Sequence, residues 1–156
     1  IDGLVHLIGA FAGGASVAET DDATLDRMLD LNFRSAFLVI RALLPQLRAQ
    51  GSGRIVAIAS KAAVEPQALA GAYSASKAAL VSLIQTVARE NSDQRISANV
   101  VLPGTIDTPA NRAAQPSADH SKWVHPCQVA KLLVHLVSDQ ASEVSGAVIP
   151  IYGGEA

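Results

Sequence analysis

Short apolar runs alternate with longer amphipathic stretches along this chain, and this alternation constrains the fold more than any other feature. The apolar runs predict strands at about Leu4–Ile8, Arg54–Ala59, Ser97–Leu102 and Ala147–Ile151. The stretches between them predict helices at about Thr20–Ala49, with a bend before Pro45, and at Tyr73–Asn91 and Pro126–Val137. Strands that alternate with helices in this way form a parallel sheet with crossover helices. We therefore expect an α/β fold.

The composition limits what such a fold can do. The chain has 156 residues, 49% of them hydrophobic and 17% charged, which fits one ordered domain with a substantial core. A net charge of -2 gives no basic field, so we expect a small-molecule partner and neither nucleic acid nor a membrane. The apolar stretches are shorter than the ~20 residues that span a bilayer. Cys127 is the only cysteine, which fits a reducing, cytoplasmic location.

Tyr73 and Lys77 provide the clearest chemical signal. Residues four apart on a helix project from one face, so the ammonium of Lys77 is expected near the phenol of Tyr73. A phenol ordinarily titrates near pKa ~10, and a neighbouring positive charge lowers that pKa towards the range useful for proton transfer. Ser60 follows a predicted strand and could hold a carbonyl or alkoxide oxygen beside the tyrosine. This combination suits interconversion of a carbonyl and an alcohol.

The pattern Tyr-x-x-x-Lys after such a strand and serine resembles the short-chain dehydrogenase/reductase family, and further matches follow in that family's order. The segment 2–9 resembles a strand that ends in Asn-Asn-Ala-Gly, of which only Gly9 is shared. Leu31-Asn32-Phe33 resembles the family's mid-helix asparagine. The segment 99–109 is similar to the Pro-Gly segment that passes the nicotinamide, and Ser145-Gly146 and Gly153-Gly154 resemble the last strand. The matches span essentially the whole chain.

The resemblance implies a Rossmann-like, doubly wound parallel sheet and either NAD or NADP as cofactor. It implies a catalytic set of Asn32, Ser60, Tyr73 and Lys77. Tyr73 would donate or accept the proton, Lys77 would lower its pKa and bind the nicotinamide ribose, and Ser60 would orient the substrate. The implied cofactor-binding residues are Gly9, Tyr73, Lys77, Pro103, Gly104, Ile106 and Thr108. The family also implies a homodimer or homotetramer assembled through the helices at 20–49 and 73–91.

Several of these residues have simpler explanations that the sequence leaves open. Ser60 could cap the end of a strand, and Asn32 could make an ordinary hydrogen bond between helices rather than hold a water near Lys77. His6 could contact the cofactor or be a satisfied core histidine. His120, His125, His135 and Cys127 do not have the spacing of a zinc site, so we assign no metal.

The chain has no Gly-rich turn of the kind that receives a cofactor pyrophosphate. Gly9, Gly13 and Gly14 do not match the spacing G-x-G-x-x-G, and no β-α-β unit surrounds them. We therefore expect residues 1–156 to be the carboxyl-terminal part of a single domain, with an incomplete sheet. The edge of the strand at 4–8 would then lie bare, so this part is not expected to be a self-sufficient, active unit. The sequence does not distinguish NAD from NADP.

The stretch Thr108–Val124 is rich in Pro, Ser, Asn and Ala and predicts a long loop that serves as a substrate lid. Asn111, Arg112 and Trp123 are its candidates for substrate selection, although Trp123 could instead anchor the loop. Segments 9–14, 108–112 and 118–123 also resemble the dihydropteridine reductases, a subgroup of the family that lacks a serine at the Ser60 position. Pterin reduction is therefore a second function that the sequence allows. It also allows a catalytically silent cofactor-binding or scaffold protein, and a dehydratase or epimerase on the same fold.

Overall fold

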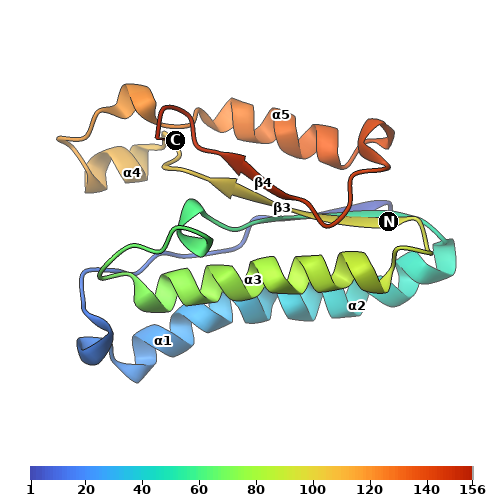
Figure 1. The fold of residues 1–156 in the computed structure, drawn as a ribbon, viewed down its shortest axis with the longest axis horizontal. Coiled ribbons are helices and arrows are strands. Elements are labelled where there is room, and N and C mark those ends of the chain that lie inside the picture. The colour runs from blue at the N-terminus through green and yellow to red at the C-terminus, as the bar shows by residue number, and fades with distance from the viewer. Residues whose placement is uncertain (156) are drawn as a thin grey trace.

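The computed structural model describes residues 1–155 and has an α/β architecture (Figure 1). The strands are β1 (Gly3–His6), β2 (Gly53–Ile58), β3 (Ile96–Pro103) and β4 (Val148–Ile151). The helices are α1 (Asp22–Leu29), α2 (Ser35–Gln50), α3 (Gly71–Glu90), α4 (Pro109–Ala114) and α5 (Pro126–Leu136). Single turns of 3-10 helix lie at Val17–Glu19, Lys61–Ala63, His120–Lys122 and Asp139–Ala141.

The four strands form one sheet in the order β1-β2-β3-β4, and every neighbouring pair is parallel. Helices α2 and α3 cover one face of the sheet, and α5 covers the other (Figure 1). The α/β class and the parallel sheet predicted from the alternating pattern are confirmed. Because all strands run the same way, their carboxyl ends meet at one edge of the sheet, where α/β proteins bind ligands.

Each face of the sheet has its own apolar core. The core under α2 and α3 includes Ile40, Leu47, Ile55, Leu80 and Ile84. The core under α5 includes Val56, Val101, Val129, Leu133 and Leu136. Val56 and Ile55 are adjacent in β2 and point to opposite faces, as the two-residue period of a strand requires. Adjacent residues of one buried strand therefore contribute to the two different cores.

The predicted helix at 20–49 contains one irregular turn. It begins with α1, where Asp21 accepts a hydrogen bond from Thr24 N at 2.7 Å. A π-helical turn at Asp30–Arg34 then joins α1 to α2. Helix α2 continues through Pro45, before which the sequence predicts a bend, and a departure from α-helical hydrogen bonding lies at Asp30–Arg34. Single π-turns inside longer helices are often found at functional sites.

The predicted long loop at Thr108–Val124 is partly helical, which corrects that expectation. The Thr108 side chain accepts a hydrogen bond from Asn111 N at 3.2 Å and caps α4, whose first residue is Pro109. A second turn follows at His120–Lys122. The segment returns to the sheet through hydrogen bonds that link Thr105 and Asp107 to Val124. The sequence signal for α4 is only a capping residue and a proline, which predicts a helix less strongly than a long amphipathic pattern does.

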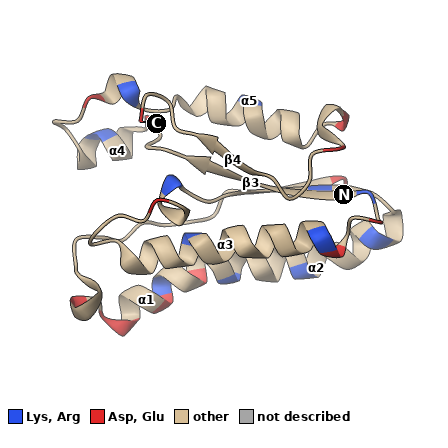
Figure 2. Cartoon of the chain, viewed as in Figure 1, with Lys and Arg blue, Asp and Glu red and all other residues tan. Residues whose placement is uncertain are grey.

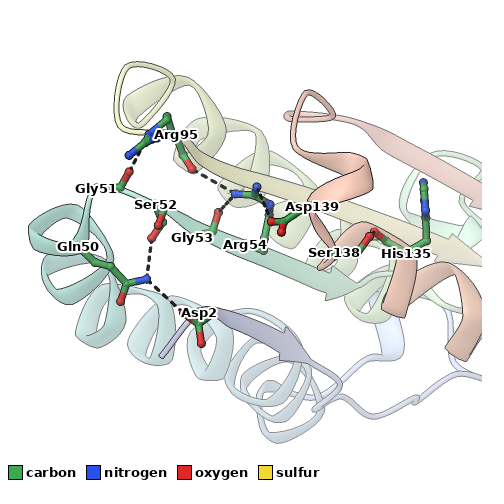
Figure 3. Close-up of polar contacts among 10 residues, drawn as sticks. All are labelled: Asp2, Gln50, Gly51, Ser52, Gly53, Arg54, Arg95, His135, Ser138 and Asp139. Atoms are coloured by element: carbon green, nitrogen blue, oxygen red, sulfur yellow. Dashed lines mark hydrogen bonds and ion pairs between the residues drawn. The ribbon is translucent and has the colours of Figure 1, made fainter.

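Polar contacts fasten the amino-terminal ends of β2 and β3, at the opposite end of the sheet from the strands' carboxyl ends (Figure 3). Arg54 Nη1 donates to the carbonyls of Gly53 at 3.0 Å and Arg95 at 3.3 Å. Its Nη2 lies 3.7 Å from Asp139 Oδ1. One guanidinium thus connects three segments of the chain and helps to stabilise this end of the sheet.

The outer surfaces show charges of both signs and an open strand edge. Helices α1 and α3 have charges of both signs, whereas the charged residues of α2 are all Arg (Figure 2). Strand β1 pairs only with β2, and the apolar Val5, Leu7 and Ile8 in or after it are exposed. Bare apolar strand edges are unusual in stable domains. In the described part of the chain, no helix is long and apolar enough to cross a membrane.

Candidate active site

The predicted catalytic residues meet at the carboxyl ends of β1 and β2. Ser60 lies two residues beyond β2 and caps the next turn by accepting a hydrogen bond from Ala62 N at 3.2 Å. Tyr73 lies in the first turn of α3, and Lys77 follows one turn later. The Ser60 hydroxyl lies near enough to the Tyr73 phenol to oppose the rise in its pKa, so the strand end and the helix meet at this point. The capping role that the sequence left open for Ser60 is therefore present, and it does not take the residue away from the tyrosine.

Lys77 is buried, with 5% of its surface exposed, and has no carboxylate partner within salt-bridge distance in the described residues. Its Nζ donates a hydrogen bond to the carbonyl of Ile58 at 3.1 Å. Burial lowers the pKa of Lys77 to about 8, from an ordinary value of 10.5, because desolvation disfavours the charged form. An ammonium carries three donors, so a ligand at this position can accept the others.

Tyr73 differs from the expectation in its titration. Burial raises the pKa of the phenol above its ordinary value, and the hydrogen bond with Ser60 opposes that rise. The lowered pKa expected from Lys77 does not appear, because desolvation of the buried phenol dominates. At neutral pH the phenol is consequently protonated.

Asn32 lies in the π-helical turn and is fully buried. Its Oδ1 accepts from Ala10 N at 2.9 Å, and its Nδ2 donates to Ala10 O at 2.9 Å. The same Nδ2 donates to Ser76 Oγ at 3.0 Å, and Ser76 Oγ donates to the carbonyl of Tyr73 at 2.7 Å. The structure therefore shows the hydrogen-bonding role that the sequence left open for Asn32. The amide connects the loop after β1 to the helix turn that carries Tyr73.

Gly9 lies against both of these buried side chains. A Cβ atom at this position would lie 2.9 Å from Asn32 Oδ1 and 2.9 Å from Lys77 Nζ. Such contacts are too close for an unshifted neighbour, so the lack of a side chain lets the backbone approach the ammonium. This explains in physical terms why the loop after β1 has a glycine at this point.

The segment from Pro103 to Thr108 follows β3 at the same edge of the sheet. Gly104 N donates to Ile151 O at 3.0 Å, and Thr105 N donates to Glu155 Oε2 at 2.7 Å. Asn111 Nδ2 donates to the Ile106 carbonyl at 2.8 Å. Among residues 1–155, no hydrogen bond uses the Ile106 amide. Of the groups predicted to face the cofactor, that amide is available, while the Ile106 carbonyl already has one partner.

The lid candidates are bound within their own segment. Trp123 is buried and its ring centroid lies 4.3 Å from that of His120, so the anchoring explanation fits Trp123. Arg112 Nη2 pairs with Asp107 Oδ2 at 2.8 Å, and this ion pair lowers the pKa of Asp107. Asn111 is occupied by its bond to the Ile106 carbonyl. None of these three side chains contacts Ser60, Tyr73 or Lys77 through a hydrogen bond in the described structure.

His6 proves to be a buried histidine at the end of β1. Its Nε2 lies 3.3 Å from Ser35 Oγ on α2. Burial, followed by the positive charge of Lys77, lowers the pKa of His6. A neutral imidazole paired with a helix hydroxyl matches the core-histidine alternative.

Three contributors to the site were not singled out from the sequence. Ser76 connects Asn32 to the Tyr73 backbone, and Phe11 packs its ring against Tyr73. Lys61 Nζ donates to the Glu155 carbonyl and lies 4.7 Å from the Tyr152 ring centroid, which ties the turn after Ser60 to the end of the chain. Ser76 stands inside the Tyr-Ser-Ala-Ser-Lys motif and could have been noticed there. The contacts of Phe11 and Lys61 join distant segments and leave no local pattern.

Two surface cavities lie outside the cluster of Ser60, Tyr73 and Lys77. A cavity of about 360 Å³ lies at the amino-terminal end of β3, lined by residues that include Arg89, Arg95, Ser97, Glu143 and Ser145. A smaller cavity of about 200 Å³ adjoins the loops on either side of the site, lined by residues that include Gly13, Thr20, Leu69, Gly71 and Ala72. The larger cavity therefore lies at the amino-terminal end of the strands, away from the catalytic cluster. The smaller cavity lies beside that cluster, near the carboxyl ends of the strands.

Comparison with known proteins places this geometry in a family. A family model described as enoyl-(acyl carrier protein) reductase matches residues 1–155. Dehydrogenase/reductase SDR family member 6 of Aquarana catesbeiana is 34% identical over 169 residues, which cover 99% of this chain and 69% of that protein.

Solved structures agree with this result. An oxidoreductase of the short-chain dehydrogenase/reductase family from Burkholderia thailandensis is similar with a TM-score of 0.89 and 33% identity, over 99% of this chain and 64% of that one. A 4-hydroxyisoleucine dehydrogenase complexed with NADH is similar with a TM-score of 0.87 and 28% identity, over 99% of this chain and 69% of that one. The chain thus spans about two thirds of the length of these relatives. It belongs to the short-chain dehydrogenase/reductase family.

Proposed function

We propose that the protein interconverts a carbonyl and an alcohol on a small molecule, with NAD or NADP as cofactor. The observation that carries this proposal is the pairing of a protonated tyrosine with a buried lysine on one helix face. Ser60 lies near enough to Tyr73 to influence its pKa, and Lys77 keeps ammonium donors beside Gly9 and the Ile58 carbonyl. A general acid, an orienting hydroxyl and a free cationic donor are the protein groups that carbonyl reduction requires.

The residues divide the work in the reducing direction. Ser60 donates a hydrogen bond to the carbonyl oxygen, and Tyr73 transfers its phenolic proton to the same oxygen. The phenol carries that proton at neutral pH, because its pKa lies above the ordinary value. Asn32 holds the loop after β1 and, through Ser76, the backbone of Tyr73. The bound nicotinamide supplies the hydride, and accepts one in the reverse direction.

The residues present fit the nicotinamide riboside part of that cofactor. The Lys77 ammonium can donate to ribose hydroxyls, and Gly9 leaves the space beside it free of a side chain. The Ile106 amide can donate to a carboxamide oxygen, with Pro103, Gly104 and Thr108 shaping the same segment. The complex of a relative with NADH supports this assignment, which leaves NAD and NADP equally open.

We also propose that residues 1–156 act as the carboxyl-terminal part of a single domain, completed by a pyrophosphate-binding segment that these residues do not contain. The exposed apolar side chains Val5, Leu7 and Ile8 along the open edge of β1 support a further layer of structure there. Without that segment the chain would lack the pyrophosphate site and be inactive. The outer face of α2, which exposes Phe37, Leu38 and Val39, is the proposed surface for a second copy.

Pterin reduction is the second candidate function, because an exposed aromatic ring, Phe11, lies beside Tyr73 in the segment 9–14 that resembles the pterin-reducing subgroup. A catalytically silent protein is disfavoured by the intact cluster of Asn32, Ser60, Tyr73 and Lys77. Retention of Ser60, which orients a carbonyl oxygen, favours the carbonyl assignment over the pterin.

The test is stoichiometric turnover by the full-length enzyme. Ketones, aldehydes and quinonoid dihydropterin are incubated with NADH and with NADPH, and both cofactor oxidation and product are measured. The proposal expects one alcohol per cofactor oxidised. Reduction of the pterin alone would select the second candidate. Product without net cofactor oxidation would indicate a dehydratase or epimerase, and cofactor binding without any turnover would indicate a silent protein.

A further inference from the structure

Phe11 lies where a substrate would meet the proton donor. Its ring centroid is 4.9 Å from that of Tyr73, and the two ring planes are inclined at 74°. This is the edge-to-face arrangement that aromatic rings prefer. Phe11 is nevertheless 64% exposed, so most of its surface remains uncovered. A phenyl ring that touches the reacting side chain and is otherwise open has a free surface for a ligand.

Neighbouring backbone holds Phe11 in this position. A Cβ atom on Gly13 would lie 2.8 Å from Phe11 Cζ and 3.2 Å from Leu69 O, so the ring folds back over a glycine. Gly14 N donates to Leu69 O at 2.8 Å and ties the loop after β1 to the loop before α3. Leu69 adopts a left-handed backbone with φ of 63°, which is unfavourable for a leucine and requires support from its surroundings.

The two tied loops present apolar groups and no charge around Tyr73. Leu69 is 53% exposed on the second loop. The segments 9–14 and 66–72 contain no Asp, Glu, Lys or Arg. Of the two lysines that flank these segments, Lys61 is engaged by the Glu155 carbonyl and by Glu65 at 3.4 Å, and Lys77 is the proposed ligand of the cofactor ribose. A charged substrate would find no partner on these loops, whereas a flat apolar group would cover exposed carbon.

We propose that Phe11 is a substrate-positioning residue that selects carbonyl compounds whose carbonyl carbon bears an aromatic ring. The substrate ring packs on the open surface of Phe11 while its carbonyl oxygen reaches Tyr73 and Ser60. The exposed Leu69 on the tied loop offers further apolar surface to the same ring. This inference rests on the proposed carbonyl chemistry, and it adds the substrate class.

The experiment compares acetophenone with its saturated counterpart, cyclohexyl methyl ketone. Both are apolar and of similar size, and only the first has an aromatic ring. Binding to the full-length enzyme is measured by NMR with oxidised cofactor present, because neither ketone can then be reduced. Turnover with reduced cofactor is measured separately. We expect Phe11→Leu to weaken acetophenone binding about fivefold, within the range of one aromatic pair, and the saturated ketone less than twofold.

Two further variants sharpen the comparison. Phe11→Trp keeps an aromatic surface and should retain the preference for acetophenone. Val134→Ala removes an apolar side chain that is 67% exposed on α5, on the other face of the sheet, and should change neither ketone's binding. Equal weakening of both ketones by Phe11→Leu would mean that Phe11 only supports Tyr73, which overturns the inference. So would an unchanged preference, or no binding of acetophenone by the unaltered enzyme.

The outcomes separate this inference from the proposed function. Selective binding of acetophenone without any turnover would leave the role of Phe11 standing and would refute the carbonyl reductase assignment. Ketone turnover without a Phe11-dependent preference would support the carbonyl reductase assignment and refute the role of Phe11.

Discussion

Lys77 Nζ donates a hydrogen bond to the carbonyl of Ile58, 3.1 Å away, at the last residue of β2. This contact fixes the second turn of α3 against the carboxyl edge of the sheet. It also holds a positive charge in a place where only 5% of the residue is exposed. The pKa of Lys77 is consequently about 8, so its protonation affects both the stability of the fold and the chemistry of the site.

The stability of the full-length enzyme should depend on pH through Lys77. Its pKa is about 8 in the folded protein against an ordinary 10.5, so between these values the unfolded chain binds more protons. The free energy of unfolding therefore rises with pH across this window, and the full difference corresponds to about 3 kcal/mol. Urea unfolding at pH 8 and pH 10 should show a rise that Lys77→Met lacks.

The matched control for that measurement is Lys131→Met, which removes an exposed lysine from α5. It should keep the rise between the two pH values. At pH 7, Lys77→Met should gain about 1–2 kcal/mol of stability, since relief of the buried charge exceeds the lost hydrogen bond. The same variant should bind cofactor more weakly. A pH dependence equal to that of the unaltered enzyme would show that Lys77 is not the titrating group.

Tyr73→Phe should cut kcat by at least ~10²-fold, the usual scale of general acid–base catalysis, and leave cofactor affinity within about twofold. The phenyl ring keeps its edge-to-face contact with Phe11, so the fold should be retained. Tyr152→Phe is the control, because it removes the hydroxyl of the only other tyrosine. Steady-state kinetics and cofactor titration decide the matter, and near-normal turnover by Tyr73→Phe would remove it from the mechanism.

Much of this site follows from the sequence because its parts are local. The apolar runs place Ser60 at a strand end, and four-residue spacing places Tyr73 and Lys77 on one helix face. The titration of Tyr73 could not be read in the same way, because its pKa depends on how far burial outweighs nearby charges. The π-helical turn at Asp30–Arg34 and the contact of Phe11 with Tyr73 depend on packing between distant segments. Such contacts produce no periodic pattern in the sequence from which they could be predicted.

Gly9→Ala should act through Lys77. The added Cβ would lie 2.9 Å from Lys77 Nζ, which is the end of a flexible side chain and can move away, and 2.9 Å from Asn32 Oδ1, which hydrogen bonds hold in place. We expect the dissociation constant of the cofactor to rise about tenfold, because the ammonium leaves its donor position, and stability to fall by about 1 kcal/mol or more, because Asn32 must also shift. In a double-mutant cycle measured on cofactor affinity, Gly9→Ala should have little further effect once Lys77 is methionine. Additive losses in the cycle would place the effect of Gly9 elsewhere.

Asn32→Ala should lower both stability and activity. It removes two hydrogen bonds to Ala10 and one to Ser76, which corresponds to about 2–3 kcal/mol. Asn91→Ala is the control, since Asn91 is equally buried and bonded to Arg48 and Val87 at the far end of α3. It should lose stability to a similar degree and keep its kcat. Equal loss of kcat in both variants, measured well below their unfolding temperatures, would reduce Asn32 to a structural residue.

Leu38→Glu should disrupt the proposed contact between copies of the protein. Leu38 is exposed on the outer face of α2 together with Phe37, and a carboxylate placed between two apolar helix faces would lose its hydration without gaining a partner. Gln46→Glu is the matched control, because it adds the same charge at an exposed polar position of the same helix. Light scattering of the full-length protein should show a smaller assembly for Leu38→Glu alone. A monomer in the unaltered protein at micromolar concentration would refute the interface, and so would an assembly of unchanged mass in Leu38→Glu.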